Sequence, residues 1–393
     1  MIYLIIALFL LTLIYIYDIR GIKKNRKFWY NTVQLVLILL AGLRYRIGTD
    51  TPNYLHRFYY IYPSLQDFSF IDYPIGGDGP LFVLMNSLVI SLNGKFFIVQ
   101  LMQAFFVISL IFHYFEKHSN YIFTCALFYF VLCYVQFNFE IMRGSMSIVV
   151  CLYANDYVLR KKWLKAYTLY IVAFIFHAQA LILFAVPLLL FLRLNFKGIV
   201  ILLGSVVGGI LIQHYFGDII EMLSFAESIN DKAVRYADQD IYNGAGGNVF
   251  FYIVHIFPAL FYGLFSLIYV KRKKKYHEIL SLEPFVMLGL IFLILQMNLQ
   301  ILSRYVDYFS IYLVMIMAEC AIMICSSRRT KRSLSLTRCA VLFIPFFFLV
   351  IYKYSITYQR YIPYNSVLDR KIDKEREEAI YNPMIGEAYL NEY

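Results

Sequence analysis

The sequence predicts an all-α, polytopic integral membrane protein. We expect a bundle of about 10–12 transmembrane helices, with re-entrant or interfacial half-helices and two long extracytoplasmic loops. The first observation is composition: the 393 residues are 61% hydrophobic and only 16% charged, with a mean hydropathy of +0.64. Soluble domains are close to 25% charged. The second is that apolar stretches able to cross the bilayer recur along the chain, and the third is that clusters of Lys and Arg separate them.

Ten stretches are predicted to span the membrane, because each is apolar over roughly the 20 residues that a crossing needs. They are 2–17, 30–43, 95–115, 121–137, 143–159, 198–214, 249–270, 285–302, 304–325 and 338–352. Residues 81–93 are predicted to form a re-entrant or interfacial helix. Residues 165–192 are predicted to break around His177 and return, which gives twelve crossings, or ten if this hairpin is re-entrant. No cleavage site follows the first stretch, so it is not expected to be a removed signal peptide.

The basic clusters predict the orientation, because cytoplasmic turns carry an excess of Lys and Arg. The clusters are Arg20 to Lys27, Arg160 to Lys165, Lys271 to Lys275 and Arg328 to Arg332. With all four in the cytoplasm, both chain ends lie outside. We expect residues 1–353 to form a transmembrane domain with outer loops at about 44–80 and 215–248, followed by an extracytoplasmic tail at 354–393.

The net charge of +11 is then mainly an orientation signal, so we do not expect a nucleic-acid partner. The sequence has no GxxxxGK[ST] loop, no GxGxxG after a strand and no HExxH, which leaves an ATP-driven pump or a zinc protease unsupported. The six cysteines lie in or beside apolar stretches without metal-like spacing. They are interpreted as small core residues, and neither a metal nor a cofactor is expected.

Polar residues that the predicted topology leaves over gather on the outer side. They are Arg44, Arg46 and Asp50 in the first loop, Asn138, Glu140 and Arg143 in the next turn, His177, Arg235 in the 215–248 loop, and Arg304 and Tyr308 near the head of a late span. Ionisable groups at membrane depth are costly, so they are functional candidates. Arg143 and Arg304 are the strongest, because apolar sequence surrounds each. An arginine such as Arg46 or Arg235 has an alternative role, which is to reach toward lipid headgroups.

Several fixed guanidiniums on one outer face suit a diphosphate, because arginine binds phosphate oxygens in bidentate fashion. There is no nucleotide pool outside the cell. A membrane enzyme acting there would therefore use a lipid-linked phosphate.

Three stretches carry a family resemblance. The first is Arg44-x-Arg46-Ile-Gly48-Thr-Asp50-x-x-x-Tyr54, and the second runs from Arg143 to Ala173-Phe-Ile-Phe-His177-Ala-Gln-Ala180. The third is Arg304-Tyr-Val-Asp-Tyr308-Phe309, with Tyr361-Ile-Pro-Tyr364 after the last span. In this order and spacing they resemble the EpsG/Wzy-like family of bacterial polysaccharide polymerases, which make O-antigen, capsule or exopolysaccharide. The resemblance covers about residues 40–365; one departure is Gly144, where the family commonly has Gln.

The resemblance implies a GT-C-like fold in the bacterial cytoplasmic (inner) membrane, with an active site that faces the periplasm or the outside. It implies an inverting, metal-independent glycosyl transfer that needs no cofactor. The donor would be a growing glycan on undecaprenyl diphosphate, and the acceptor a new undecaprenyl-diphosphate-linked repeat unit. Membrane lipids are expected partners, and a chain-length regulator is a candidate protein partner.

The resemblance also implies roles for the polar residues. Arg143 and Arg304 would stabilise the departing diphosphate, with Arg44 and Arg46 in support. Asp50 is the first choice of general base, and His177 competes for that role or orients the diphosphate. Substrate-binding roles extend to Tyr54, Asn138, Glu140, Arg235 and Tyr308. The 215–248 loop is predicted to be a lid over the acceptor glycan, hinged at Gly244, Gly246 and Gly247.

Other functions stay open at this stage. A transporter or flippase of lipid-linked oligosaccharides would also place Arg and His in the membrane, but the sequence shows no internal repeat. An O-antigen ligase would act on similar lipid-linked substrates. A polysaccharide acyltransferase, or a structural partner of a chain-length regulator without chemistry of its own, would be compatible with the same composition.

Overall fold

The structure is a computed structural model that describes residues 2–73, 77–214, 256–273, 277–298, 302–325, 343–344, 347–348 and 358–381. Within these ranges all regular secondary structure is helical, and the one strand-like pairing is an isolated bridge between Arg44 and Ser366. The predicted all-α class is therefore confirmed for the described part of the chain. The chain divides into two compact units, one formed by Met1–Leu181 with Tyr354–Tyr393 and the other by Ile182–Lys353.

Three helices of the described part are long and apolar enough to cross a membrane. They are Ile2–Ile19, Phe96–His118 and Ser303–Cys325. Six shorter apolar helices are Pro80–Ser91, Ile122–Leu132, Trp163–Phe176, Ala178–Leu189, Phe196–Leu211 and Glu283–Leu295. These helices confirm the apolar helical character of most predicted spans. The number of crossings, the GT-C-like arrangement and the division into a membrane domain and an outer tail stay predictions.

The first unit contains the amino-terminal helices and the carboxyl-terminal segment. Its elements are α1 (Ile2–Leu13) with its π-helical continuation η1 (Ile14–Ile19), α2 (Arg26–Gly42), α3 (Thr51–Tyr60), α4 (Pro80–Ser91), α5 (Phe96–His118), α6 (Ile122–Leu132), η2 (Gln136–Glu140), α7 (Met142–Leu159), α8 (Trp163–Phe176), η6 (Tyr358–Arg360), α18 (Lys374–Arg376) and η7 (Glu377–Tyr381). The 3₁₀ helix η3 (Ala178–Leu189) follows α8. The predicted break at His177 is confirmed, because α8 ends at Phe176.

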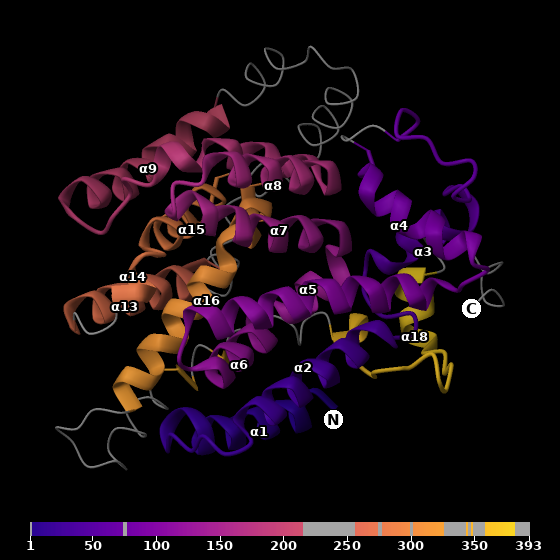
Figure 1. Cartoon of the computed structure of the whole chain (residues 1–393), viewed down its shortest axis with the longest axis horizontal. Coiled ribbons are helices and arrows are strands. Elements are labelled where there is room, and N and C mark those ends of the chain that lie inside the picture. Colours follow the sequence, from indigo (N-terminus) through magenta and orange to yellow (C-terminus); the bar gives the residue numbers. More distant parts are fainter. Residues whose placement is uncertain are drawn as a thin grey trace. The chain divides into compact units, whose positions relative to one another are not determined.

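Helix α2 packs along α5, and α7 packs along α8 (Figure 1). The approach of α2 to α5 is close enough that a Cβ on Gly42 would lie 2.7 Å from the Cα of Leu101. Helices α7 and α8 are joined by a three-residue turn and therefore run antiparallel. Ser147 of α7 donates a hydrogen bond of 2.8 Å to the carbonyl of Ala173 of α8, which sets the register of the pair.

The first predicted outer loop, about 44–80, contains a helix that the sequence analysis did not predict. Helix α3 begins after Asp50, which occupies the N-cap position, and Pro52 lies in its first turn. Proline is favoured there because the first helical N–H groups have no partner within the helix. Gly79, at a φ of +78°, and Pro80 similarly precede and begin α4. The second predicted loop, 215–248, lies outside the described residues.

The second unit contains α9 (Phe196–His214), α13 (Phe257–Lys273), α14 (His277–Leu280), α15 (Glu283–Leu295) and α16 (Ser303–Cys325). The buried carboxylate of Glu283 connects two basic segments of this unit. It accepts hydrogen bonds of 2.6 Å from Lys271 and from the backbone N–H of Leu194, and Arg193 lies 3.4 Å away. Burying a carboxylate is costly without such partners, so these contacts tie the turn before α9 to the start of α15.

Candidate functional site

Glu140 organises the first loop. Its carboxylate accepts hydrogen bonds from the backbone N–H of Thr49 at 3.0 and 3.1 Å and from that of Asp50 at 3.1 Å. The hydroxyl of Tyr361, from the carboxyl-terminal segment, donates to the same carboxylate at 2.7 Å. Charge-assisted hydrogen bonds are stronger than neutral ones, so Glu140 fixes both the start of α3 and the tail. It has a scaffolding role that the sequence analysis did not assign to it.

Arg44 and Arg46 are buried in the scaffold of this loop. Arg44 is fully buried: it donates to the carbonyl of Ala41 at 2.5 Å and lies 5.0 Å from the centre of the Phe139 ring. Arg46 forms a bidentate pair with Glu377 at 2.6 and 2.5 Å. These contacts direct both guanidiniums into the protein. The predicted supporting role toward a diphosphate stays a prediction for both residues.

Arg143 meets the first loop at the turn that precedes α4. Its Nη1 donates to the carbonyl of Gly77 at 2.8 Å and to Oδ1 of Asp78 at 3.2 Å. Arg57 of α3 donates to the other oxygen of the same carboxylate, Oδ2. Two guanidiniums therefore share one carboxylate, and they come from elements that are far apart in sequence. We call Arg57, Asp78 and Arg143 the arginine cluster.

Tyr54 lies beside the arginine cluster. The guanidinium of Arg143 is 6.0 Å from the centre of the Tyr54 ring, at the edge of cation–π range. Burial raises the pKa of Tyr54, and the nearby Arg143 opposes this effect in part. The phenol is therefore neutral at physiological pH and can donate a hydrogen bond. Tyr54 was predicted to bind substrate, and the structure places it next to Arg143.

His177 follows the last residue of α8, close to the same turn. A Cβ on Gly79 would lie 2.1 Å from the carbonyl oxygen of Phe176, so the turn of the arginine cluster packs directly against the end of α8. Because Ser147 pairs with Ala173 in an antiparallel register, Arg143 and His177 each lie one turn further toward the same end. The sequence analysis placed both on the outer side, and the structure brings them to one end of the helix pair.

Four further predicted site residues have different positions. Asn138 is fully buried and donates to the hydroxyl of Tyr129 at 3.0 Å and to the carbonyl of Tyr134 at 2.8 Å, which makes it a core residue in this structure. Arg304 lies in the first turn of α16, and Tyr308 is buried one turn later, both in the second unit. Arg235 lies outside the described residues, as do the predicted lid and its glycine hinge.

Arg57 and Asp78 are the site residues that the sequence analysis missed. Once Asp50-Thr51-Pro52 is taken as a helix start, Tyr54 and Arg57 share one helical face at the i,i+3 spacing. That signal was available in the sequence. No comparable signal identifies Asp78, because its link to Arg143 depends on how the 77–79 turn meets α7.

Among the described residues, no group of three His, Cys, Asp or Glu side chains could hold a metal ion. The expectation of a metal-independent reaction stays a prediction. The arginine cluster retains one positive charge after Asp78 is counted, and Tyr54 adds a neutral donor. Such a set of donors suits a phosphate or diphosphate group.

One of three comparisons with known proteins gives a match. The EpsG family model matches residues 27–366. The chain belongs to the EpsG family. No curated protein matches the chain, and no solved structure does. The matched range contains the whole arginine cluster, Glu140 and His177, whereas Arg376 and Glu377 lie beyond its end. EpsG-family membership, together with the apolar helices, indicates an integral membrane protein and a glycosyltransferase-type polysaccharide polymerase.

Proposed function

We propose that this EpsG-family protein polymerises lipid-linked repeat units on the outer face of the bacterial cytoplasmic membrane. The growing glycan would be transferred from undecaprenyl diphosphate to the non-reducing-end hydroxyl of a new lipid-linked unit. The observation that carries the proposal is the arginine cluster, in which Arg57 and Arg143 bind the two oxygens of Asp78. It supplies fixed cationic donors for a diphosphate without any nucleotide-binding motif.

The proposed glycosyl transfer breaks one bond, forms another and moves one proton. The bond between the anomeric carbon and the diphosphate oxygen breaks with its electron pair on the diphosphate. The acceptor hydroxyl forms the new glycosidic bond from the opposite side, which inverts the configuration, and its proton passes to a base. Preorganised cations aimed at the developing charge contribute most to such a transfer, and Arg143 and Arg57 take that role.

Asp78 orients the two arginines. The guanidiniums of Arg57 and Arg143 repel each other when both lie close together. The carboxylate of Asp78 compensates this repulsion before substrate binds. For Arg304, a role toward the diphosphate stays a proposal that rests on the family resemblance. Asp50 is the proposed general base and His177 the competing one, as the family resemblance implies.

Contacts group the segments of the proposed site, and charge favours the outer side for them. The first loop bonds to Glu140 and to Glu377, and its end at Asp78 bonds to Arg143. In Figure 1, α3, α4 and α18 accordingly lie at one end of the first unit. These contacts favour one side of the membrane for all of these segments. The basic clusters at Arg160–Lys165 and Arg20–Lys27 favour the cytoplasm for the opposite side.

The test is polymer analysis in a deletion strain that carries Arg143→Lys or Arg57→Lys. Lysine keeps the charge but loses the planar, bidentate donor geometry. We expect the polymer ladder to collapse to a single repeat unit, with turnover reduced by roughly 10²-fold for Arg143→Lys. Arg370→Lys, an exposed residue of the carboxyl-terminal segment, is the matched control and should keep a normal ladder.

The same gel separates the alternatives. Loss of even the single repeat unit would favour a flippase or a ligase over a polymerase. A normal ladder in both Arg143→Lys and Arg57→Lys, at normal protein levels, would refute the role of the arginine cluster. Asp50→Asn and His177→Gln in the same strain compare the two candidate bases.

A further inference from the structure

The loop between α3 and α4 carries a cluster of aromatic rings. Phe68 stacks on Tyr73 with ring centres 6.0 Å apart and planes at 5°. Phe70 meets Phe68 edge to face at 5.0 Å, and Tyr62 meets Tyr73 in the same manner at 6.4 Å. We call Tyr62, Phe68, Phe70 and Tyr73 the loop aromatic cluster. Such packed pairs hold each other in place.

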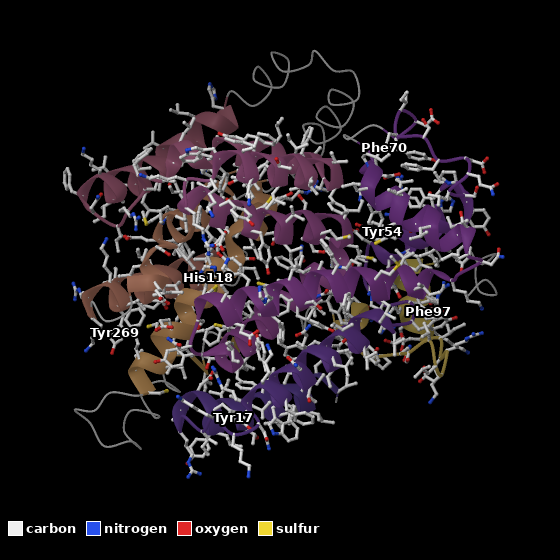
Figure 2. The ribbon with its side chains drawn as sticks, viewed as in Figure 1. Tyr17, Tyr54, Phe70, Phe97, His118 and Tyr269 are labelled. Carbon is white, nitrogen blue, oxygen red and sulfur yellow. The ribbon has the colours of Figure 1, made fainter. Side chains whose placement is uncertain are left out.

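The loop aromatic cluster is open on one side. Phe70 is 55% exposed and its neighbour Ile71 is 90% exposed, whereas Phe68 and Tyr73 are half-buried. Figure 2 shows Phe70 in the same part of the first unit as Tyr54, which lies beside Arg143. The hydroxyl of Tyr73 donates to the carbonyl of Ile61 at 3.4 Å, which helps to fix its ring. The protein therefore presents an aromatic surface that is ordered by its own contacts.

Tyr62 connects this surface to the arginine cluster. Its ring contacts Tyr73, while Asp78, Arg143 and Arg57 are near enough to act electrostatically on its hydroxyl. Tyr62 is only 7% exposed, and its hydroxyl is buried without a hydrogen-bond partner among the described residues. An orphaned buried hydroxyl is costly. Its position between the arginine cluster and the aromatic surface favours a ligand that meets both.

The charges of this loop favour a sugar over a membrane surface. Residues 58–94 contain no Lys or Arg and three carboxylates, Asp67, Asp72 and Asp78. Segments that anchor in the headgroup region typically carry Lys and Arg next to their apolar residues. A pyranose ring instead presents C–H groups on its faces and hydroxyls around its edge. Aromatic rings can cover the faces, and the exposed carboxylates of Asp67 and Asp72 can accept from the hydroxyls.

We propose that the loop aromatic cluster binds a pyranose ring of the lipid-linked glycan, immediately next to the arginine cluster that takes the diphosphate. The sugar held there is the first sugar of the glycan, which is attached to the diphosphate, because the Tyr62 hydroxyl lies within electrostatic range of the arginine cluster. This subsite rests on the proposed polymerase function. It adds a class of ligand, a neutral sugar ring, that the arginine cluster by itself does not recognise.

The test is binding of free repeat-unit oligosaccharide, released from lipid and diphosphate, to the full-length protein in nanodiscs, followed by saturation-transfer NMR. We expect Phe70→Ala with Tyr73→Ala to weaken binding by roughly tenfold, as the loss of two aromatic contacts predicts. Tyr62→Phe should weaken it by a smaller factor. Phe105→Ala, which removes an aromatic ring that is 62% exposed on α5, is the matched control. The single variant Phe70→Ala is included because Phe70 is the most exposed ring of the cluster, so its loss should not affect folding.

The outcomes separate this subsite from the proposed function. Arg143→Lys should bind the free oligosaccharide as the wild type does while losing the polymer ladder. Unchanged oligosaccharide binding in Phe70→Ala and in the double variant would overturn the subsite and leave the polymerase proposal intact. Quenching of a Phe70→Trp variant by brominated lipid would also overturn it, since the loop would then contact the membrane.

Discussion

Arg46 shows how a single side chain can be committed to the scaffold of a site. Its guanidinium and the Glu377 carboxylate are 2% and 6% exposed and form two hydrogen bonds. The neighbouring Arg376 donates to the carbonyls of Arg46, Gln359 and Pro363, at 3.2, 2.8 and 2.6 Å. The tail thus holds the first loop through buried charge, with the Arg46 side chain fixed between the two segments.

The first prediction concerns this ion pair. Glu377→Ala leaves the Arg46 guanidinium buried without its anion, which typically costs about 3–5 kcal/mol. We expect a clearly lower Tm in thermal unfolding of the purified protein. Glu378→Ala changes an exposed carboxylate at the next position and should alter stability by about 0.5 kcal/mol or less. Equal Tm values for the two variants would show that the pair contributes nothing to stability.

Arg57 and Asp78 are two residues of the candidate site that only the structure identified. Neither was chosen from the sequence, because each is one of several charges in a loop of about 37 residues. The structure selects them by contact, since Asp78 bonds to both Arg57 and Arg143. Residue type indicated the kind of chemistry, and position in space showed which of these charged residues lie together.

At the scale of elements, the first loop depends on the close approach of Gly48 to η2. Gly48 has a φ of +107°, and a Cβ there would lie 2.7 Å from the carbonyl oxygen of Phe139. This approach lets the next two backbone N–H groups reach Glu140. The loop, η2 and α3 therefore form one unit, in which a glycine is required for conformation and for space.

The second prediction compares two glycines. Gly48→Ala should destabilise the protein by roughly 2 kcal/mol or more, because backbone strain and a backbone clash add together. Gly21→Ala pays a similar conformational cost at a φ of +73°, but nothing lies within 4 Å of its Cβ. Gly21→Ala should therefore lower the Tm less and keep the polymer ladder. An equal drop in Tm for both variants would show that the contact between residue 48 and Phe139 does not contribute to stability.

At the scale of the whole chain, contacts join segments of the first unit that are far apart in sequence. The carboxyl-terminal segment pairs with the first loop through Arg44 and Ser366, and the backbone N–H of Tyr45 donates to the carbonyl of Asn365 at 2.9 Å. Two segments bonded in this way cannot be exposed on opposite sides of a bilayer. The positive-inside rule then favours the outer side for both.

The third prediction tests this arrangement by cysteine labelling. Ile71→Cys and Leu368→Cys, at positions 90% and 81% exposed, should react with a membrane-impermeant maleimide from outside. Leu164→Cys, 84% exposed in the first turn of α8 and next to the basic turn, should react only after permeabilisation. The five described native cysteines are buried and should give little background. Labelling of Ile71→Cys and Leu368→Cys from opposite sides would contradict the fold, and labelling of both from inside would contradict the orientation.

The sequence was sufficient for the properties that are local along the chain. Hydropathy and charge clusters predicted helices and membrane character, and the break at His177 followed from a disrupted apolar stretch. Ordered motifs predicted the family, which the match over residues 27–366 confirms. Helix α3 was missed because its start, Asp50 to Pro52, lies in a polar loop where hydropathy gives no helical signal.

What only the tertiary structure decided is which of these polar residues meet. Arg46 and Glu377 are separated by 331 positions, and Arg143 meets Asp78 across 65. Composition and spacing cannot specify such pairs, because each depends on how several helices pack at once. The sequence by itself therefore determined a helical membrane protein of the EpsG family with arginines suited to a diphosphate. Packing determined that Arg143 joins Arg57 around Asp78, while Arg46 is held in the scaffold by the tail.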